Sequence, residues 1–310
     1  MSHVHALLPG AEFAVREHSG NCSYDDLVAS NALVLGDAGA VLRALPSDCV
    51  QAVITSPPYW ALRDYGIEGQ VGLTETLEEF VDALADIFEE TRRVLRPDGA
   101  LWLNIGDSYT SGNRGWRAPD KKNPARAMSL RPPNPSGLKD KDLIGVPWRV
   151  AFALQDRGWY LRSEIIWRKP NAQPESVRDR PTRDHEQIFL FTKSERYKYD
   201  YEAIKGPNGR RLRTVWDINT RNDKTTSGHF ATYPPELVER CVRISTSPGD
   251  LVLDPFLGSG TTAVVAAALH RRFLGVELNP DYLAMSRNRL LDAGLMDSVG
   301  CFERRRDGEL

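Results

Sequence analysis

The feature that most constrains the fold of this chain is a repeated alternation of short apolar segments with segments of helical periodicity. We expect strands at residues 31–35, 50–55, 100–105, 160–167, 186–192, 250–254 and 272–277. We expect helices at residues 24–28, 38–45, 77–95, 146–156, 234–245, 261–270 and 280–292. Such alternation predicts an α/β fold in which a mostly parallel, doubly wound sheet carries helices on both faces.

The length of the chain and its irregular stretches predict how the fold is divided. A chain of 310 residues is long for one compact domain and short for two, so we expect one core with insertions. The predicted parts are an N-terminal arm at 1–30, a core domain at 31–292 with an insertion at 108–145 and a second irregular segment at 194–227, and a C-terminal tail at 293–310. Irregular loops of this length inside a domain are commonly functional.

Hydropathy and the distribution of cysteines indicate the cellular compartment in which the protein is expected. Apolar runs stay well below the roughly 20 residues that span a bilayer, and the first residues lack a signal-peptide pattern, so we expect a cytoplasmic protein with no membrane partner. The four cysteines, Cys22, Cys49, Cys241 and Cys301, are scattered without C-x-x-C spacing, as in structural thiols of a reducing compartment. No cysteine and histidine cluster exists, so we expect no metal site.

Charge is distributed unevenly along the chain. The net charge is -2, but residues 109–145 hold eight Lys or Arg against three Asp, and residues 168–224 hold fourteen against nine acidic residues. Each segment therefore carries +5, and the rest of the chain carries -12. This asymmetry fits a protein that contacts phosphate on one face, although two solvated basic loops would look the same.

The segment LVLDPFLGSGTT, residues 251–262, has the pattern of a ligand-binding turn. An apolar strand ends at Asp254, and Gly258 and Gly260 then allow the backbone to approach a ligand before the next helix. One strand later, Glu277 lies at a strand end, where a carboxylate can accept both hydroxyls of a ribose. The motif is not G-x-G-x-x-G, and an acidic residue precedes the glycines, which suits a cationic amino-acid cofactor better than a pyrophosphate. A simple strand-to-helix connection is the alternative.

The segment VITSPPYW, residues 53–60, follows another apolar strand. Two prolines restrict the backbone and hold Ser56 rigidly. The Ser56 hydroxyl and the Pro57 carbonyl can accept the two protons of an amino group, while Tyr59 offers a flat face on which a base can stack. A proline-rich turn beside a core aromatic is the alternative.

Together these motifs resemble those of amino-group DNA methyltransferases of the beta arrangement, over residues 31–292. In that family the catalytic tetrapeptide, here Ser56, Pro57, Pro58 and Tyr59, precedes the cofactor motif, so the motif order is circularly permuted. The resemblance implies a Rossmann-like methyltransferase fold with inserted DNA-recognition loops and S-adenosyl-L-methionine as cofactor. It also implies the cofactor-binding residues Asp37, Thr55, Phe230, Ala231, Thr232, Asp254, Pro255, Phe256, Gly258, Ser259, Gly260, Thr261, Glu277 and Asn279.

The resemblance further implies which residues act on the substrate. Ser at the first tetrapeptide position, rather than Asp or Asn, resembles the branch that methylates N4 of a flipped cytosine in duplex DNA; N6 of adenine stays open. We expect double-stranded DNA as partner, and a cognate restriction endonuclease and a homodimer are further partners to consider. The expected DNA contacts are Trp60, Arg63, Arg114, Arg117, Lys121, Lys122, Arg210, Arg211 and Arg213.

Two other classes of protein remain as alternatives. Methyltransferases of RNA or of protein glutamine resemble the chain less, because their sites favour Asn-Pro-Pro-Tyr and the unpermuted order. A non-catalytic DNA-binding module would have lost its cofactor site, whereas Asp254, Gly258, Gly260 and Glu277 are all present.

Overall fold

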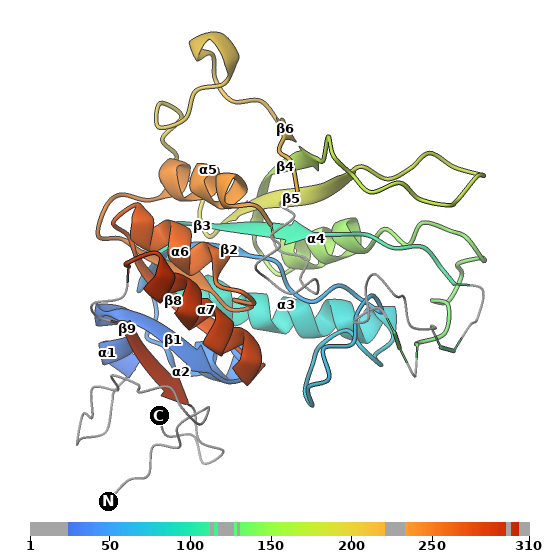
Figure 1. Cartoon of the computed structure of the whole chain (residues 1–310), viewed down its shortest axis with the longest axis horizontal. Helices are drawn as coiled ribbons and strands as arrows, with labels where there is room; N and C mark the ends of the chain where they lie inside the picture. The colour runs from blue at the N-terminus through green and yellow to red at the C-terminus, as the bar shows by residue number, and fades with distance from the viewer. Residues whose placement is uncertain are drawn as a thin grey trace, which may run out of the picture.

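The computed structural model describes residues 24–111, 115–116, 127–128, 131–220, 233–295 and 299–303. Within them a single sheet of nine strands has the order β6-β4-β5-β3-β2-β7-β8-β1-β9 (Figure 1). The strands are β1 (Asn31–Leu35), β2 (Val50–Thr55), β3 (Leu95–Ile105), β4 (Tyr160–Arg168), β5 (His185–Thr192), β6 (Val215–Asp217), β7 (Leu251–Asp254), β8 (Arg272–Glu277) and β9 (Val299–Glu303).

Strand β5 is the exception in an otherwise parallel sheet. It pairs antiparallel with both β3 and β4, and the other six pairings are parallel. The first residues of β5 therefore lie at the edge where β2, β3 and β4 end, which we call the carboxyl edge. The mostly parallel α/β sheet expected from the sequence is confirmed.

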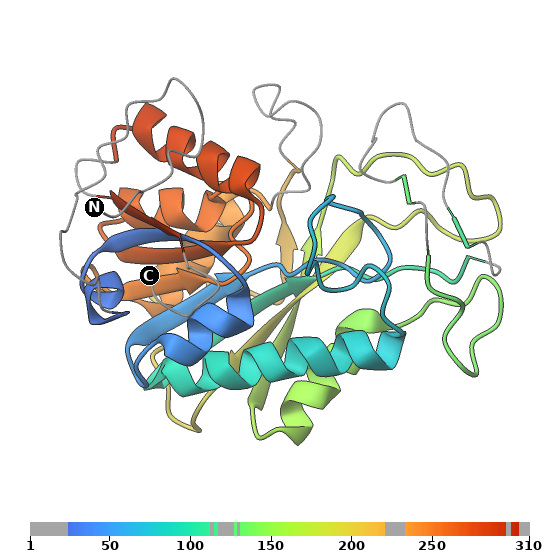
Figure 2. The ribbon, with the colours of Figure 1, turned by 90° about the horizontal axis from the view of Figure 1, so that it is seen from below.

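Helices cover both faces of this sheet. They are α1 (Tyr24–Ala29), α2 (Ala38–Ala44), α3 (Leu77–Val94), α4 (Val146–Asp156), α5 (Pro235–Ser245), α6 (Thr261–Ala268) and α7 (Pro280–Asp292). The first four pack on one face and the last three on the other, and Figure 2 shows α3 and α4 below the sheet with α6 and α7 above it. All seven expected helices are present, which confirms the doubly wound arrangement.

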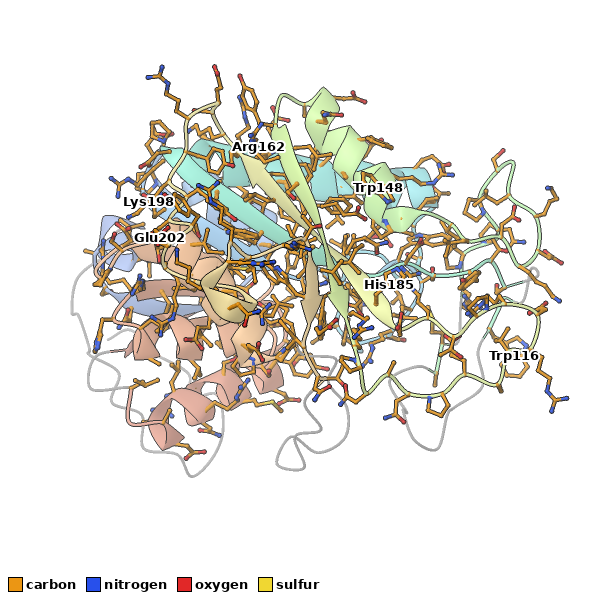
Figure 3. All side chains as sticks on the ribbon, turned by 90° about the horizontal axis from the view of Figure 1, so that it is seen from above. Trp116, Trp148, Arg162, His185, Lys198 and Glu202 are labelled. Atoms are coloured by element: carbon orange, nitrogen blue, oxygen red, sulfur yellow. The ribbon has the colours of Figure 1, made fainter. Side chains whose placement is uncertain are left out.

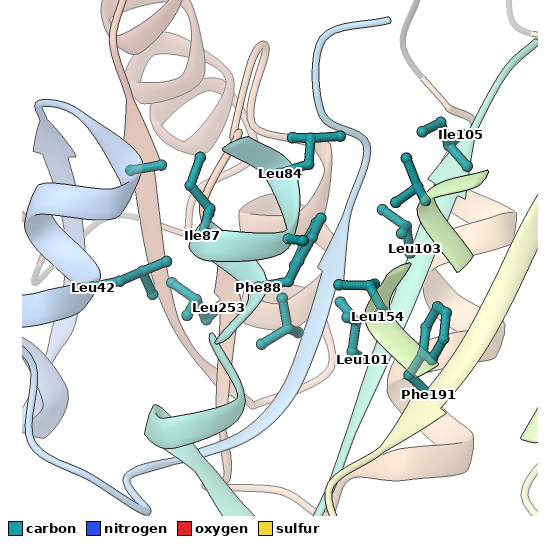
Figure 4. Close-up of a cluster of buried hydrophobic side chains, with 14 of the residues drawn as sticks. Leu42, Leu84, Ile87, Phe88, Leu101, Leu103, Ile105, Leu154, Phe191 and Leu253 are labelled. Atoms are coloured by element: carbon teal, nitrogen blue, oxygen red, sulfur yellow. The ribbon is translucent and has the colours of Figure 1, made fainter. Parts of the chain in front are cut away.

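Alternation along the strands explains the two cores. In β3, Leu101, Leu103 and Ile105 face α3 and α4, whereas Trp102 faces the opposite core with helix α5. Figure 4 shows the first core, in which Phe88 of α3 lies among side chains from β3, β5 and β7. Helix α3 begins with a capping box between Thr76 and Glu79, so its apolar stripe starts at a defined residue.

Three features differ from the sequence-based expectation. Strand β6 lies in the segment read as irregular, and β9 lies in the expected tail, where it pairs with β1. The residues Arg96–Gly99 were expected to separate a helix from a strand, but β3 already begins at Leu95 and pairs with β2. Pairing with neighbouring strands, rather than local pattern, ordered these segments.

None of the helices in the described part of the chain is both long and apolar enough to cross a membrane.

Phe88→Ala should lower the free energy of unfolding by about 3–5 kcal/mol, because Phe88 is 0% exposed and its removal leaves a cavity beneath the sheet. Phe152→Ala in α4 is the matched control, since Phe152 is 51% exposed, and should cost about 1 kcal/mol or less. Urea denaturation followed by circular dichroism measures both. Equal losses for the two variants would contradict the placement of Phe88.

Candidate active site

The carboxyl edge of the sheet brings both sequence motifs to one pocket. The neighbouring strands β2, β7, β8 and β1 each end beside it. Ten of the residues expected from the sequence line the pocket: Asp37, Ser56, Pro58, Pro255, Phe256, Gly258, Ser259, Thr261, Glu277 and Asn279. The fold thus brings residues that lie 201 positions apart in the chain, such as Ser56 and Leu257, into the lining of one pocket.

Glu277 and Gly258 line this pocket and are hydrogen-bonded to each other. The backbone N–H of Gly258 donates to Glu277 Oε2 at 2.7 Å, and that of Asn279 donates to Oε1 at 2.9 Å. Gly258 has a φ of 55°, and a Cβ built on it would meet no atom within 4 Å, so the backbone lies open on that side. Burial raises the pKa of Glu277. Each carboxylate oxygen retains acceptor capacity, so Glu277 can receive ribose hydroxyls.

Asp254 has a different role from the one expected. Its Oδ1 accepts hydrogen bonds from Thr55 Oγ1 at 2.7 Å and from the Phe256 N–H at 3.1 Å. Its Oδ2 accepts from Tyr233 Oη and from Thr262 Oγ1, each at 2.7 Å. Burial raises the pKa of Asp254, although all of these bonds favour its charged form.

These four bonds use the acceptor sites of the carboxylate, and Asp254 does not line the pocket. Thr55 and Gly260 are also set back from it. Thr55 is 1% exposed, and a Cβ on Gly260 would lie 2.8 Å from Ser286 Cβ of α7. These three residues were expected to contact the cofactor; in the structure they hold the frame of the pocket and do not line it.

The tetrapeptide is anchored through Tyr59. Ser56 Oγ donates to Tyr59 Oη at 3.3 Å, and Tyr59 Oη donates to Glu186 Oε2 at 2.8 Å. A Cβ on Gly106 would lie 2.4 Å from Tyr59 Cε2, so the glycine lets the ring lie against β3. Pro57 is buried, while Ser56 is half-buried and lines the pocket.

Sequence reasoning missed part of the site. The segment after the tetrapeptide contributes Tyr65, Ile67, Gln70 and Val71 to the pocket wall. Tyr65 meets Tyr282 of α7 edge to face, with ring centroids 6.0 Å apart. In the sequence, Tyr65 stood out only as an aromatic residue in an irregular segment. Glu186, in the run DHEQ, was interpreted only as part of a strand.

Trp60 is not available to a base. It is 4% exposed, packs in the core, and its Nε1 donates to the Glu75 carbonyl at 2.9 Å. The expectation that Trp60 contacts DNA was wrong, because the chain turns inward directly after Tyr59. Arg63 lies half-buried in the segment that follows.

The expected basic contacts are placed unevenly. Arg210, Arg211 and Arg213 are exposed and precede β6, the strand at one end of the sheet, which β4, β5 and β3 separate from β2 and Ser56. They do not line the pocket, and their contact with DNA stays a prediction. Seven further residues lie outside the described residues: Arg114, Arg117, Lys121, Lys122, Phe230, Ala231 and Thr232.

Two loops beyond the carboxyl edge are joined to each other. We call them the rim: the described residues of 106–145 and residues 169–184, which extend to the right in Figure 1. Lys141 Nζ lies 2.7 Å from Asp179 Oδ2, and the Arg180 guanidinium stacks 3.9 Å from the centre of the Tyr109 ring. Trp116, 64% exposed, projects from the first loop far from the sheet (Figure 3). The rim is one surface contributed by two insertions.

No group of three or more His, Cys, Asp or Glu side chains that could hold a metal ion occurs among the described residues.

Comparison with known proteins identifies the family. A model of the DNA methylase family, covering N6 and N4 methyltransferases, matches residues 50–288. The chain belongs to this DNA methylase family. Type II methyltransferase M.XycI of Xanthomonas campestris pv. cyanopsidis is 58% identical to the methylase over 85% of this chain and 89% of the relative. Type II methyltransferase M.SmaI of Serratia marcescens is 50% identical over 89% of this chain and 99% of the relative.

Solved structures resemble the methylase over most of its length. A putative DNA modification methylase of Thermus thermophilus, in complex with S-adenosyl-L-methionine, has a TM-score of 0.64 and 28% identity, covering 89% of this chain and 99% of its own. The cytosine-N4-specific PvuII DNA methyltransferase has a TM-score of 0.65 at 21% identity, covering 89% and 95%, which shows a shared fold.

S-adenosyl-L-methionine is the cofactor of the methylase. The pocket fits it, because Glu277 can receive ribose hydroxyls, the open backbone at Gly258 admits close approach, and Phe256, Tyr65 and Tyr282 supply apolar walls.

Asp254→Asn should destabilise the cofactor-free methylase by about 1–3 kcal/mol, because an amide cannot accept all four hydrogen bonds and leaves a buried donor unsatisfied. Asp292→Asn, at an exposed position that ends α7, is the control and should change stability by less than about 0.5 kcal/mol. Thermal unfolding without cofactor measures both. If Asp254 only contacted the cofactor, the cofactor-free stability would not change.

Proposed function

We propose that the methylase transfers a methyl group to N4 of a flipped cytosine in double-stranded DNA. The observation that carries the proposal is Ser56, the first residue of the tetrapeptide, which lines the cofactor pocket. Ser at this position resembles the branch of the family that acts on cytosine. N6 of adenine is the competing acceptor, because Ser56 and the Pro57 carbonyl could accept the protons of an exocyclic amino group on either base.

The residues around Ser56 suit direct transfer to an amino nitrogen. Bound S-adenosyl-L-methionine supplies the methyl group as an electrophile. Ser56 Oγ and the Pro57 carbonyl accept the two amino protons, which aims the nitrogen lone pair and stabilises the positive charge that develops on the nitrogen. Tyr59, fixed by its bond to Glu186, stacks on the flipped base, and this contact offsets part of the few kcal/mol that flipping costs.

The similarity to Type II methyltransferases supports a role in restriction-modification. In that role the methylase would protect host DNA from a cognate endonuclease that reads the same site. Methylated plasmid that resists such an endonuclease, while unmethylated plasmid is cut, is the outcome expected.

The acceptor base can be identified directly. The methylase, incubated with labelled cofactor and duplex DNA, should yield N4-methylcytosine after digestion to nucleosides and mass spectrometry. Ser56→Ala should slow the transfer about 100-fold or more, because one proton acceptor and its charge stabilisation are lost. Recovery of N6-methyladenine would overturn the choice of cytosine, and undiminished transfer by Ser56→Ala would overturn the role of the tetrapeptide.

The rim is the surface we propose for DNA contact, because it borders the site and carries Arg178, which is exposed. Arg178→Ala should reduce the slope of log K against log salt concentration by about 0.9, the effect of losing one phosphate contact. Arg196→Ala is the control, because Arg196 is exposed beyond the end of β5, at the opposite edge of the sheet. Fluorescence anisotropy at several salt concentrations measures the slopes, and equal slopes for both variants would exclude this surface.

A further inference from the structure

A largely buried ion pair lies behind the tetrapeptide. Lys169 Nζ donates to Glu186 Oε1 in a close contact, and each side chain is only 18% exposed. Lys169 directly follows β4 and Glu186 is the second residue of β5, so both lie at the carboxyl edge. Strands β4, β5, β3 and β2 are consecutive in the sheet, and their ends bring the pair to Tyr59 and Ser56.

A buried ion pair is by itself weak evidence of a role in stability. Removing two charges from water is costly, and replacing a buried pair with apolar residues of similar volume is often neutral or stabilising. Here the carboxylate also receives Asn104 Nδ2 at 3.2 Å and Tyr59 Oη at 2.8 Å on Oε2. The pair is therefore connected to the catalytic tetrapeptide rather than isolated in the core.

The chemistry of the pair sets the direction of each hydrogen bond. Burial by itself raises the pKa of Glu186, but the Lys169 charge and the bonds from Lys169, Tyr59 and Asn104 hold that pKa below its usual range. Burial and the Glu186 charge raise the pKa of Tyr59 well above its usual value. A carboxylate only accepts, so the Tyr59 hydroxyl must donate to it. Tyr59 Oη is then left to accept from Ser56.

This direction matters for Ser56. Its hydroxyl hydrogen points to Tyr59 Oη, so both oxygen lone pairs are available to accept from the substrate amino group. A hydroxyl free to rotate could instead donate to the substrate nitrogen and occupy the lone pair that must attack the methyl group. The chain of bonds also polarises the Ser56 oxygen toward negative charge.

We infer that Glu186 is a positioning residue for methyl transfer, which acts through Tyr59 to keep Ser56 an acceptor, and that Lys169 keeps Glu186 charged for this task. The inference rests on the role proposed above for Ser56. It holds for either amino acceptor, cytosine or adenine.

The test is the rate of a single turnover with pre-bound cofactor and duplex DNA. Glu186→Gln can donate from its amide to Tyr59 Oη and reverse the chain of bonds, so transfer should slow by about tenfold or more. The dissociation constants for cofactor and DNA should stay within about twofold, because Glu186 does not line the pocket and acts on Ser56 through Tyr59. Glu239→Gln in α5, which breaks an exposed ion pair with Arg243, is the matched control and should leave the rate unchanged.

A second variant separates positioning from simple stability. Glu186→Gln alone leaves Lys169 unpaired and should lower the melting temperature. The double variant Glu186→Leu with Lys169→Met removes both charges and the carboxylate that accepts from Tyr59, so the melting temperature should recover while the transfer rate stays low. Recovery of the rate together with the melting temperature would show a purely structural pair and overturn the inference.

A double-mutant comparison separates this inference from the proposed role of Ser56. In a Ser56→Ala background, Glu186→Gln should have little further effect, because both changes act through the same hydroxyl. If Ser56→Ala slows transfer but Glu186→Gln does not, the inference fails and the proposed function stands. If Ser56→Ala leaves transfer unchanged, the role of the tetrapeptide fails first.

Discussion

The Asp254 carboxylate is the interaction on which the rest of the site depends. Its four hydrogen bonds come from the end of β2, the segment before α5, the turn after β7 and the first residues of α6. Thr55 is the neighbour of Ser56, and Phe256 begins the turn that lines the pocket. One buried anion thus fixes the catalytic tetrapeptide relative to the cofactor turn, although 199 residues separate Thr55 and Asp254 in the chain.

Strand direction explains why Glu186 also lies at the carboxyl edge of the sheet. Parallel strands present only their carboxyl ends at this edge, and most site residues follow a strand. Because β5 runs antiparallel, it presents its first residues there instead. Glu186 therefore meets Tyr59, and the adjacent end of β4 supplies Lys169 as counter-charge. One reversal in the sheet adds a charged support behind the tetrapeptide.

Sequence patterns predicted the parts of the methylase that depend on local chemistry. Buried apolar runs and helical stripes located the main strands and helices, since burial against neighbours on both faces requires those periods. The pocket residues Ser56, Gly258 and Glu277 were found because each lies at or shortly after the end of a strand. Three-residue β6 and the strand β9 were missed, because their pairing partners β4 and β1 order them and no local period does.

The sequence by itself determined the family, the order of the two motifs and the cofactor pocket, because glycine, proline and acidic residues at strand ends carry their chemistry locally. The tertiary structure decided which polar groups face the ligand and which face the protein. It turned Asp254 inward and Trp60 into the core, placed Arg210, Arg211 and Arg213 before the strand at one end of the sheet, and connected Glu186 to Tyr59. These outcomes depend on which way each side chain points and on which strands are neighbours, and the sequence of a single segment determines neither.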